Sequence, residues 1–204
     1  MKLRWQDWLA GLMILAAVGL LIATGVKRLN RPQLPPVDLA QSTPVEPETI
    51  LSAENFTFEG PPPETSGDRL LALFVVTAKV CDPCISEMSD YLAMLDDLDL
   101  AGVPLEPVAL VFEHDEALAR RFLGTSALPL AGAYGYPGGL VQLLGKHPKG
   151  IVLQQLVFID THTDTLFYRT LLPSSITPIE HKQEILGRMV EAFHRQRTET
   201  LVNL

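Results

Sequence analysis

The sequence predicts an α/β domain with a central mixed sheet flanked by helices, preceded by one N-terminal transmembrane helix. In the middle of the chain, short apolar runs alternate with segments of helical periodicity, which is typical of parallel strands joined by right-handed crossovers. Further along, two apolar runs around a polar turn and a long amphipathic segment indicate an antiparallel hairpin and a last helix. The 204 residues, 47% of them hydrophobic, suffice for one domain with a full core and an accessory segment.

The N-terminal segment Trp8–Val26 is an uncharged apolar run, about as long as the hydrocarbon core of a bilayer requires. Basic residues follow it at positions 27, 28 and 31, as expected at a membrane interface. A cleaved signal peptide is the alternative, because the small residues Ala23, Thr24 and Gly25 resemble a cleavage site. The length of the run favours a retained anchor, so we expect residues 1–29 to hold the chain in the membrane.

Residues 30–54 are rich in proline and polar residues and are expected to form a flexible linker. The domain is expected to span residues 55–204 and to begin with a strand near Asn55–Phe58. The run Leu70–Thr77 is apolar and β-branched, which indicates a buried strand, and a helical pattern follows it through Leu98. The next strand is expected at Pro107–Phe112, with a short helix after it through Phe122.

Residues 128–145 contain several glycines and are expected to be a loop-rich approach to a short helix at Leu140–Leu144. The glycines are not followed by Lys-Ser/Thr, so a phosphate-binding loop is rejected. Leu153–Ile159 and Leu166–Arg169 are the two strands of the expected hairpin. The last helix is expected from Pro178 to His194, with a buried stripe of Ile179, Ile185/Leu186, Met189/Val190 and Phe193.

The only two cysteines stand in the motif Cys81-Asp82-Pro83-Cys84, where the Leu70–Thr77 strand leads into its helix. Free N–H groups and the helix dipole at such a helix start stabilise a thiolate. A disulfide between cysteines this close in sequence closes too small a loop to stabilise a fold, and no second C-x-x-C or paired histidines would complete a zinc site. Thiol redox chemistry is therefore the leading hypothesis, and neither a metal nor a cofactor is expected.

The residues from Cys81 to Met88 resemble the C-x-P-C-x-x-E-M signature of the TlpA/ResA group of membrane-anchored, thioredoxin-like thiol–disulfide oxidoreductases. The resemblance implies a thioredoxin-like fold over about 55–196. It also implies catalytic roles for Cys81, Cys84 and Glu87. In this reading Cys81 attacks a partner disulfide, Cys84 resolves the mixed disulfide, and Glu87 tunes the cysteines.

The sequence departs from the family pattern around the motif and before the hairpin. Val80 replaces the usual tryptophan, and Ser89 replaces the usual proline. Thioredoxin-like enzymes also place a cis-proline before the hairpin, opposite the cysteine pair. Counting back from the hairpin strand puts Gln154 there, whereas Pro148 would need an insertion. A glutamine is expected to be trans, since a non-proline cis bond costs about 3 kcal/mol.

Two functions of different classes remain open at this stage. The favoured one is an anchored enzyme that exchanges disulfides with extracytoplasmic proteins, as in cytochrome c or metal-centre maturation, and receives electrons from a membrane thiol donor. The alternative is a non-catalytic binding or metal-delivery module of a membrane complex, which Gln154 supports. Because disulfides persist outside the cytoplasm, the domain is expected on the periplasmic side of the inner membrane. The net charge of −8 argues against nucleic-acid binding.

Overall fold

The computed structural model describes Met13 and residues 43–79, 82–126, 128–147, 150–172 and 178–202. The chain divides into two units, Met1–Leu34 and Pro35–Leu204. The expected anchor therefore lies outside the described residues, apart from the helical Met13. Within the described ranges, no helix combines the length and the apolar character that a membrane crossing requires.

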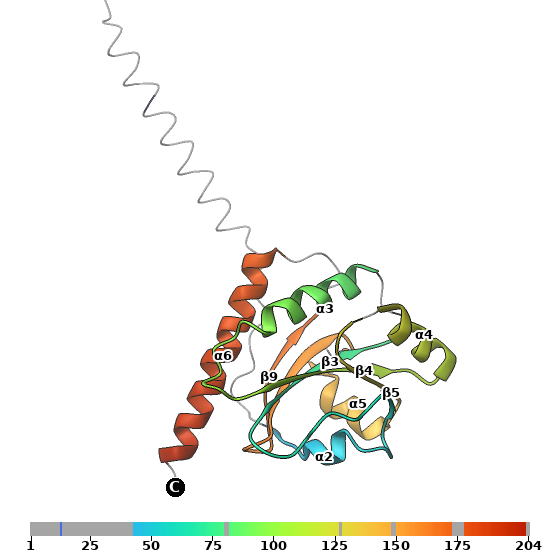
Figure 1. Ribbon diagram of the computed structural model, residues 1–204, viewed down its shortest axis with the longest axis horizontal. Coiled ribbons are helices and arrows are strands. Elements are labelled where there is room, and N and C mark those ends of the chain that lie inside the picture. Colours follow the sequence, from blue (N-terminus) through green and yellow to red (C-terminus); the bar gives the residue numbers. More distant parts are fainter. Residues whose placement is uncertain are drawn as a thin grey trace, which may run out of the picture. The chain divides into compact units, whose positions relative to one another are not determined.

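The second unit alternates strands and helices along the chain, as the sequence pattern predicts (Figure 1). Its elements are, in order, β1 (Thr43–Pro44), α2 (Pro47–Ile50), β2 (Thr57–Glu59), β3 (Leu70–Val76), α3 (Asp82–Leu95), β4 (Leu105–Phe112), α4 (Glu116–Ser126), β5 (Ala131–Gly135), α5 (Gly138–Leu144), β6 (Lys146–His147), β7 (Gly150–Ile151), β8 (Gln155–Asp160), β9 (Thr165–Leu171) and α6 (Ile179–Val202).

Seven of the strands form one mixed sheet in the order β1-β9-β8-β3-β4-β5-β2. The neighbours β3, β4 and β5 run parallel to one another, because each is joined to the next through a helix. The hairpin β8–β9 is antiparallel and joins the sheet through β8 beside β3. The predicted mixed sheet is confirmed, with the wholly buried strand β3 at its centre.

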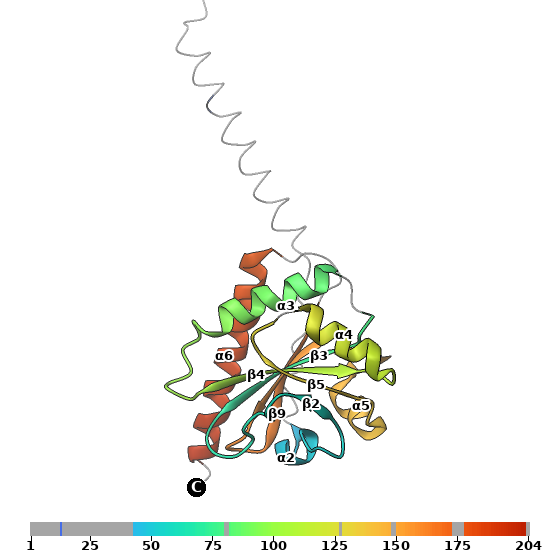
Figure 2. The same cartoon turned by 45° about the vertical axis from the view of Figure 1, so that its right-hand side comes forward.

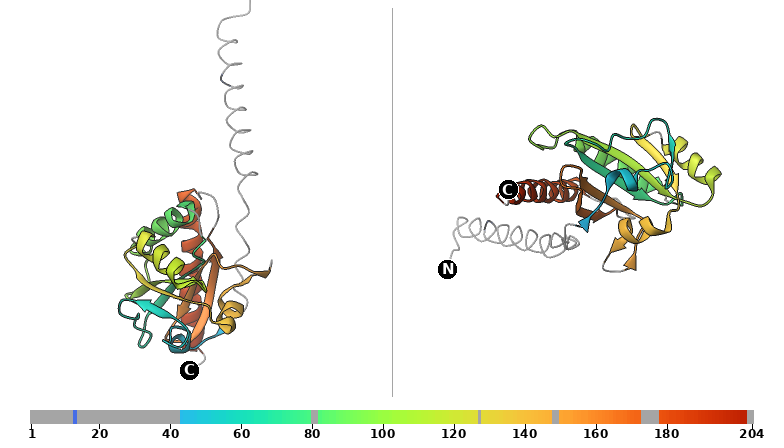
Figure 3. Two further views of the ribbon diagram at one scale, coloured as in Figure 1. Left: turned by 90° about the vertical axis from the view of Figure 1, so that its right-hand side faces the viewer. Right: turned by 90° about the horizontal axis from the view of Figure 1, so that it is seen from below.

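Helices cover both faces of this sheet, with α3, α4 and α6 on one side and α2 and α5 on the other (Figure 2). The left view of Figure 3 places α4 and α5 on opposite sides of the strands. Because side chains alternate along a strand, β3 contributes buried side chains to both faces of the sheet. Leu71, Leu73 and Val75 pack in the cluster that contains residues of α2 and α5.

The hairpin contains a β-bulge in β9, on the side of the sheet that α6 covers. Phe158 pairs with Tyr168 and Ile159 pairs with Leu166, so Phe167 is the extra residue. Phe167 contacts the ring of Phe193 on α6 at 6.1 Å between centroids, and the Tyr168 hydroxyl donates to the Ile185 carbonyl at 3.0 Å. Two consecutive residues of β9 thereby interact with α6.

Three sequence-based expectations differ from the structure. Residues 43–54 do not form a linker, because β1 pairs with β9 and Val45, Ile50 and Leu51 are buried in the core. The loop-rich stretch contains the strand β5, whose glycines and alanines lack the β-branched pattern that marks a strand. Ile179 is exposed, because it is the first residue of α6, and the buried stripe of α6 begins instead at Lys182.

Candidate functional site

The cysteine motif lies at the junction between β3 and α3, as the sequence predicts. Strand β3 ends at Val76 and α3 begins at Asp82, so Cys84 belongs to the first turn of the helix. Cys81 and the side chain of Cys84 lie outside the described residues. We expect Cys81 to be exposed at the helix start and Cys84 to be more buried, and both stay predictions.

Gln154 occupies the place directly before the hairpin strand. The next residue, Gln155, pairs with Val75 near the C-terminal end of β3. Gln154 therefore lies at the end of the sheet where β3 leads into α3. Its carbonyl accepts a hydrogen bond from the N–H of Leu172 at 2.8 Å. The described part of the chain contains no cis peptide bond, so Gln154 is trans as expected. Pro148 lies outside the described residues.

Glu87, the third expected site residue, is almost fully buried, with 1% of its side chain exposed. It follows Cys84 by three positions in α3, which places both residues on the same face of the helix. Its Oε2 lies 3.2 Å from Nζ of Lys182 on α6, whose side chain is also 1% exposed. The structure thus adds a buried cation to the region that the motif defines.

Sequence reasoning missed Lys182, although its spacing contains the signal. Position 182 precedes Ile185 by three residues and Met189 by seven, so it continues the buried stripe of α6. A lysine at such a position is normally assigned to solvent, because isolated buried charges are costly. Only the packing of α3 against α6 shows that the carboxylates of Glu87 and Asp90 lie beside this ammonium.

Two further side chains of α3 complete the environment of this pair. Asp90 forms an ion pair with Nζ of Lys182, and 49% of its side chain is exposed, so it connects the buried ammonium with solvent. The ring of Tyr91 lies 5.9 Å from the same nitrogen. Burial, the nearby charge of Glu87 and the neighbouring Tyr168 together raise the pKa of Tyr91. The hydroxyl of Tyr91 has no hydrogen-bond partner among the described residues.

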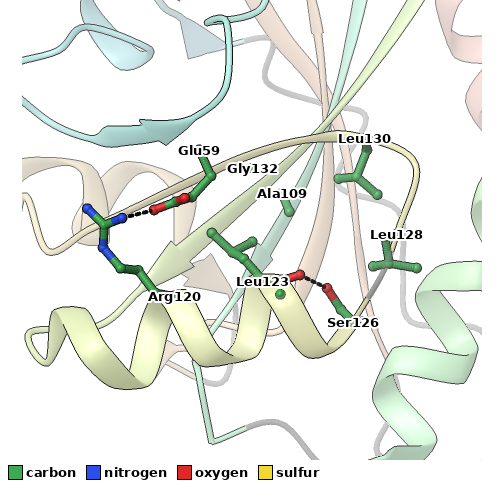
Figure 4. Close-up of a pocket in the computed structure, with 9 residues that line it drawn as sticks. Glu59, Ala109, Arg120, Leu123, Ser126, Leu128, Leu130 and Gly132 are labelled. Carbon is green, nitrogen blue, oxygen red and sulfur yellow. Dashed lines mark hydrogen bonds and ion pairs between the residues drawn. The ribbon is translucent and has the colours of Figure 1, made fainter.

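A separate hollow lies between α4 and β5 (Figure 4). Leu123, Leu128 and Leu130 form its apolar side, and the ion pair between Arg120 and Glu59, at 2.9 Å, lies at one end. Arg120 also binds Glu116, at 2.8 Å. The hydroxyl of Ser126, which also lines the hollow, donates to the Leu123 carbonyl at 2.9 Å. The described residues also contain no cluster of three side chains suited to a metal ion.

The topology decides the fold class. The hairpin β9–β8 joins the parallel pair β3–β4 through antiparallel pairing of β8 with β3, and the helix that carries the cysteine motif follows β3. The fold is thioredoxin-like. Among the described parts of this thioredoxin-like domain, the surroundings of Glu87 are the strongest candidate site.

Comparison with known proteins finds similar folds only among solved structures. No protein-family model matches the chain, and no curated protein sequence matches it. The similar structures include thiol–disulfide oxidoreductases of the thioredoxin-like superfamily. A secreted Mycobacterium tuberculosis disulfide oxidoreductase homologous to E. coli DsbE is 14% identical, with a TM-score of 0.40 over 61% of this chain and 81% of that chain.

Two other similar solved structures cover a larger share of this chain. BsSco, a member of the Sco family of cytochrome c oxidase assembly proteins, is 14% identical, with a TM-score of 0.46 over 76% of this chain and 96% of that chain. Peroxiredoxin Q from Xanthomonas campestris is 11% identical, with a TM-score of 0.47 over 75% of this chain and 99% of that chain.

Proposed function

We propose that the chain is a thiol–disulfide oxidoreductase that exchanges disulfides with partner proteins. The observation that carries this proposal is the position of the C-x-P-C-x-x-E-M motif. The motif spans the β3–α3 junction of a thioredoxin-like domain, and its glutamate is buried one turn after Cys84. Helix starts favour thiolates, and a buried acid beside a dithiol can exchange protons with it.

The reaction proceeds in two exchanges. The thiolate of Cys81 attacks one sulfur of a partner disulfide, a mixed disulfide forms, and the first partner thiolate leaves. The thiolate of Cys84 then attacks the sulfur of Cys81, the intramolecular disulfide forms, and the second partner thiolate leaves. The domain dithiol is thereby oxidised by two electrons and the partner disulfide is reduced by two.

The proposal is tested by the reduction of a model protein disulfide, such as that of insulin, by the dithiol form of the chain. We expect turnover with the wild-type chain, none with Cys81→Ser, and an accumulating mixed disulfide with Cys84→Ser. Absence of turnover and of any mixed disulfide would overturn the proposal. In that case the metal-delivery alternative, which Gln154 favours, predicts stoichiometric binding of copper or zinc by the dithiol form.

The proposed location is the inner membrane, with residues 1–29 as a retained anchor and the thioredoxin-like domain on the periplasmic side. The apolar run Trp8–Val26 and the dithiol motif support this proposal. Partners would then be extracytoplasmic dithiol proteins, including apocytochromes or proteins that receive metals, and a membrane thiol donor would supply electrons. A reporter enzyme fused after Leu204 should be active only outside the cytoplasm, and activity confined to the cytoplasm would refute the topology.

A further inference from the structure

We propose that Lys182 is a positioning residue that holds the Glu87 carboxylate in place as the proton acceptor for Cys84, and that Asp90 provides Lys182 with a second anionic partner when the proton is transferred. This inference rests on the proposed oxidoreductase function and names a residue outside the cysteine motif. It follows from the burial and charges of three side chains on two helices.

The ammonium of Lys182 is buried, and burial of a charge is unfavourable. The side chain of Lys182 is 1% exposed, and a buried charge is tolerated only where other charges and hydrogen bonds compensate it. The ammonium lies between the carboxylates of Glu87 and Asp90, both on α3. A carboxylate buried without a cation would take up a proton, because burial disfavours its charged form. The ammonium of Lys182 therefore compensates the charge of the buried Glu87 carboxylate.

The carboxylates of Glu87 and Asp90 outnumber the single ammonium of Lys182 in this group of three side chains. Two carboxylates face one ammonium, so one carboxylate can accept a proton while the ammonium keeps an anionic neighbour. When Glu87 is protonated, Lys182 still has its ion pair with Asp90, whose half-exposed carboxylate is stabilised by water. Asp90 thus removes the penalty that a single buried ion pair would impose on protonation of Glu87.

Helix α3 carries both Glu87 and the second cysteine of the motif. Glu87 is three residues after Cys84 on the same helix, so the two positions are neighbours on one face. In the proposed resolving step, the Cys84 thiol transfers its proton to the Glu87 carboxylate and becomes a thiolate. This thiolate attacks Cys81 of the mixed disulfide, the Cys81–partner bond breaks, and the partner leaves as a thiolate. Glu87 afterwards returns its proton to solvent.

Three of the titratable groups around the cluster stay in one form between pH 5 and pH 9. Tyr91 on α3 faces the ammonium, and burial raises the pKa of its hydroxyl. Tyr168 on β9 donates to the Ile185 carbonyl of α6, and burial raises its pKa to about 12. Arg188 on α6 interacts electrostatically with Tyr168 and stays cationic. Tyr91, Tyr168 and Arg188 therefore do not account for a change of rate in this range.

The test follows the resolving step as a function of pH. Reduced full-length chain reacts with an aromatic disulfide reagent that releases a coloured thiolate at each exchange, so the second release reports attack by Cys84. We compare the wild-type chain with Lys182→Met, Lys182→Arg and Asp90→Asn. Arg188→Met is the control, because it removes a cation of the same helix from a partly exposed pair.

We expect the second release at neutral pH to be about tenfold slower in Lys182→Met, with the rate recovering at higher pH, which corresponds to about 1.4 kcal/mol. Lys182→Arg should retain most of the wild-type pH profile because it keeps the charge, and Arg188→Met should be unchanged. Asp90→Asn should be slower by about threefold. If Lys182→Met does not fold, as judged by circular dichroism, Asp90→Asn decides alone, since Asp90 is half-exposed.

Two failures are distinguishable in this experiment. A wild-type chain that shows no second release would refute the proposed function itself. A wild-type chain that shows it, with folded Lys182→Met or Asp90→Asn giving the same pH profile as the wild type, would overturn the role of Lys182 and leave the function standing. The same loss in Lys182→Arg as in Lys182→Met would also overturn it, since the charge would then be irrelevant.

Discussion

Arg197 on α6 forms a bidentate ion pair with Asp160 at the end of β8. Nη2 lies 2.8 Å from Oδ1 of Asp160, and Nε lies 3.1 Å from Oδ2. Asp160 is fully buried, whereas Asp68, which binds the same guanidinium through Nη1 at 3.1 Å, is half-exposed. The Phe193 ring lies 4.6 Å from Cζ of Arg197. This one side chain therefore joins α6 to the hairpin and to the segment before β3.

Replacement of Arg197 should strongly destabilise the domain. We expect Arg197→Met to lower the free energy of unfolding by about 3 kcal/mol, because it leaves the carboxylate of Asp160 buried without its cation. Denaturant unfolding followed by circular dichroism measures the loss. Arg188→Met, which removes a partly exposed pair with Glu184, should change stability by at most about 0.5 kcal/mol. Equal losses in the two variants would contradict the structural role of the buried pair.

Asp68 should make stability depend on acidity. The hydrogen bond from Arg197 holds the pKa of the Asp68 carboxyl below its ordinary value, although burial acts in the opposite direction. A lowered pKa in the folded state contributes stability above the unfolded pKa and loses it as pH falls through the folded pKa. Asp68→Asn should therefore be less stable than the wild type at pH 7, by less than about 1 kcal/mol because Asp68 is half-exposed.

The difference between Asp68→Asn and the wild type should shrink as the pH is lowered below about 4, where the wild-type carboxylate becomes protonated. Unfolding midpoints of both proteins at pH 7 and pH 3 measure this. A difference of the same size at both pH values would show that the charge of Asp68 is unimportant.

Tyr168 should limit stability in alkaline solution. Burial raises the pKa of its hydroxyl from 10.0 to about 12. A raised pKa leaves the full contribution in place below pH 10 and removes it as the pH rises toward 12. Tyr168→Phe should cost about 1 kcal/mol at pH 8, because the hydrogen bond to the Ile185 carbonyl is lost. Above pH 10 the two proteins should converge; a constant gap in unfolding midpoints up to pH 11.5 would refute the assignment.

Gly135 should not tolerate a side chain. A Cβ at this position would meet the carbonyl oxygen of Asn55 closer than van der Waals contact allows, and it would also press on the Phe56 ring at 3.3 Å. Gly135→Ala should therefore cost about 1–3 kcal/mol. The matched variant is Gly187→Ala in α6, where a Cβ meets nothing within 4 Å, and it should stabilise by about 0.5–1 kcal/mol. Thermal unfolding of both variants checks the contrast in sign.

Local patterns in the sequence predict most of the elements. The apolar run at β3, the helical spacing after it and the hairpin turn each depend on residues near one another in the chain, and the structure confirms all three. Strand β5 escapes this reasoning because all of its residues except Tyr134 are glycine or alanine, and its strand conformation depends on hydrogen bonds to β4 and β2. The fold between residues 43 and 54 escapes it for a similar reason, since Ile50 packs in a core cluster that includes residues of β3, β4 and β8, far along the chain.

The sequence by itself determined the α/β order of elements and the place of the cysteine motif where β3 leads into α3, because periodicity and helix-start chemistry are local properties. Through the resemblance of its motif, the sequence also predicts a site role for Glu87. Only the tertiary structure decided that Lys182 of α6 lies beside Glu87 and that Arg197 closes on Asp160. These pairs join residues 95 and 37 positions apart in the chain, and no local pattern shows which buried charges will meet.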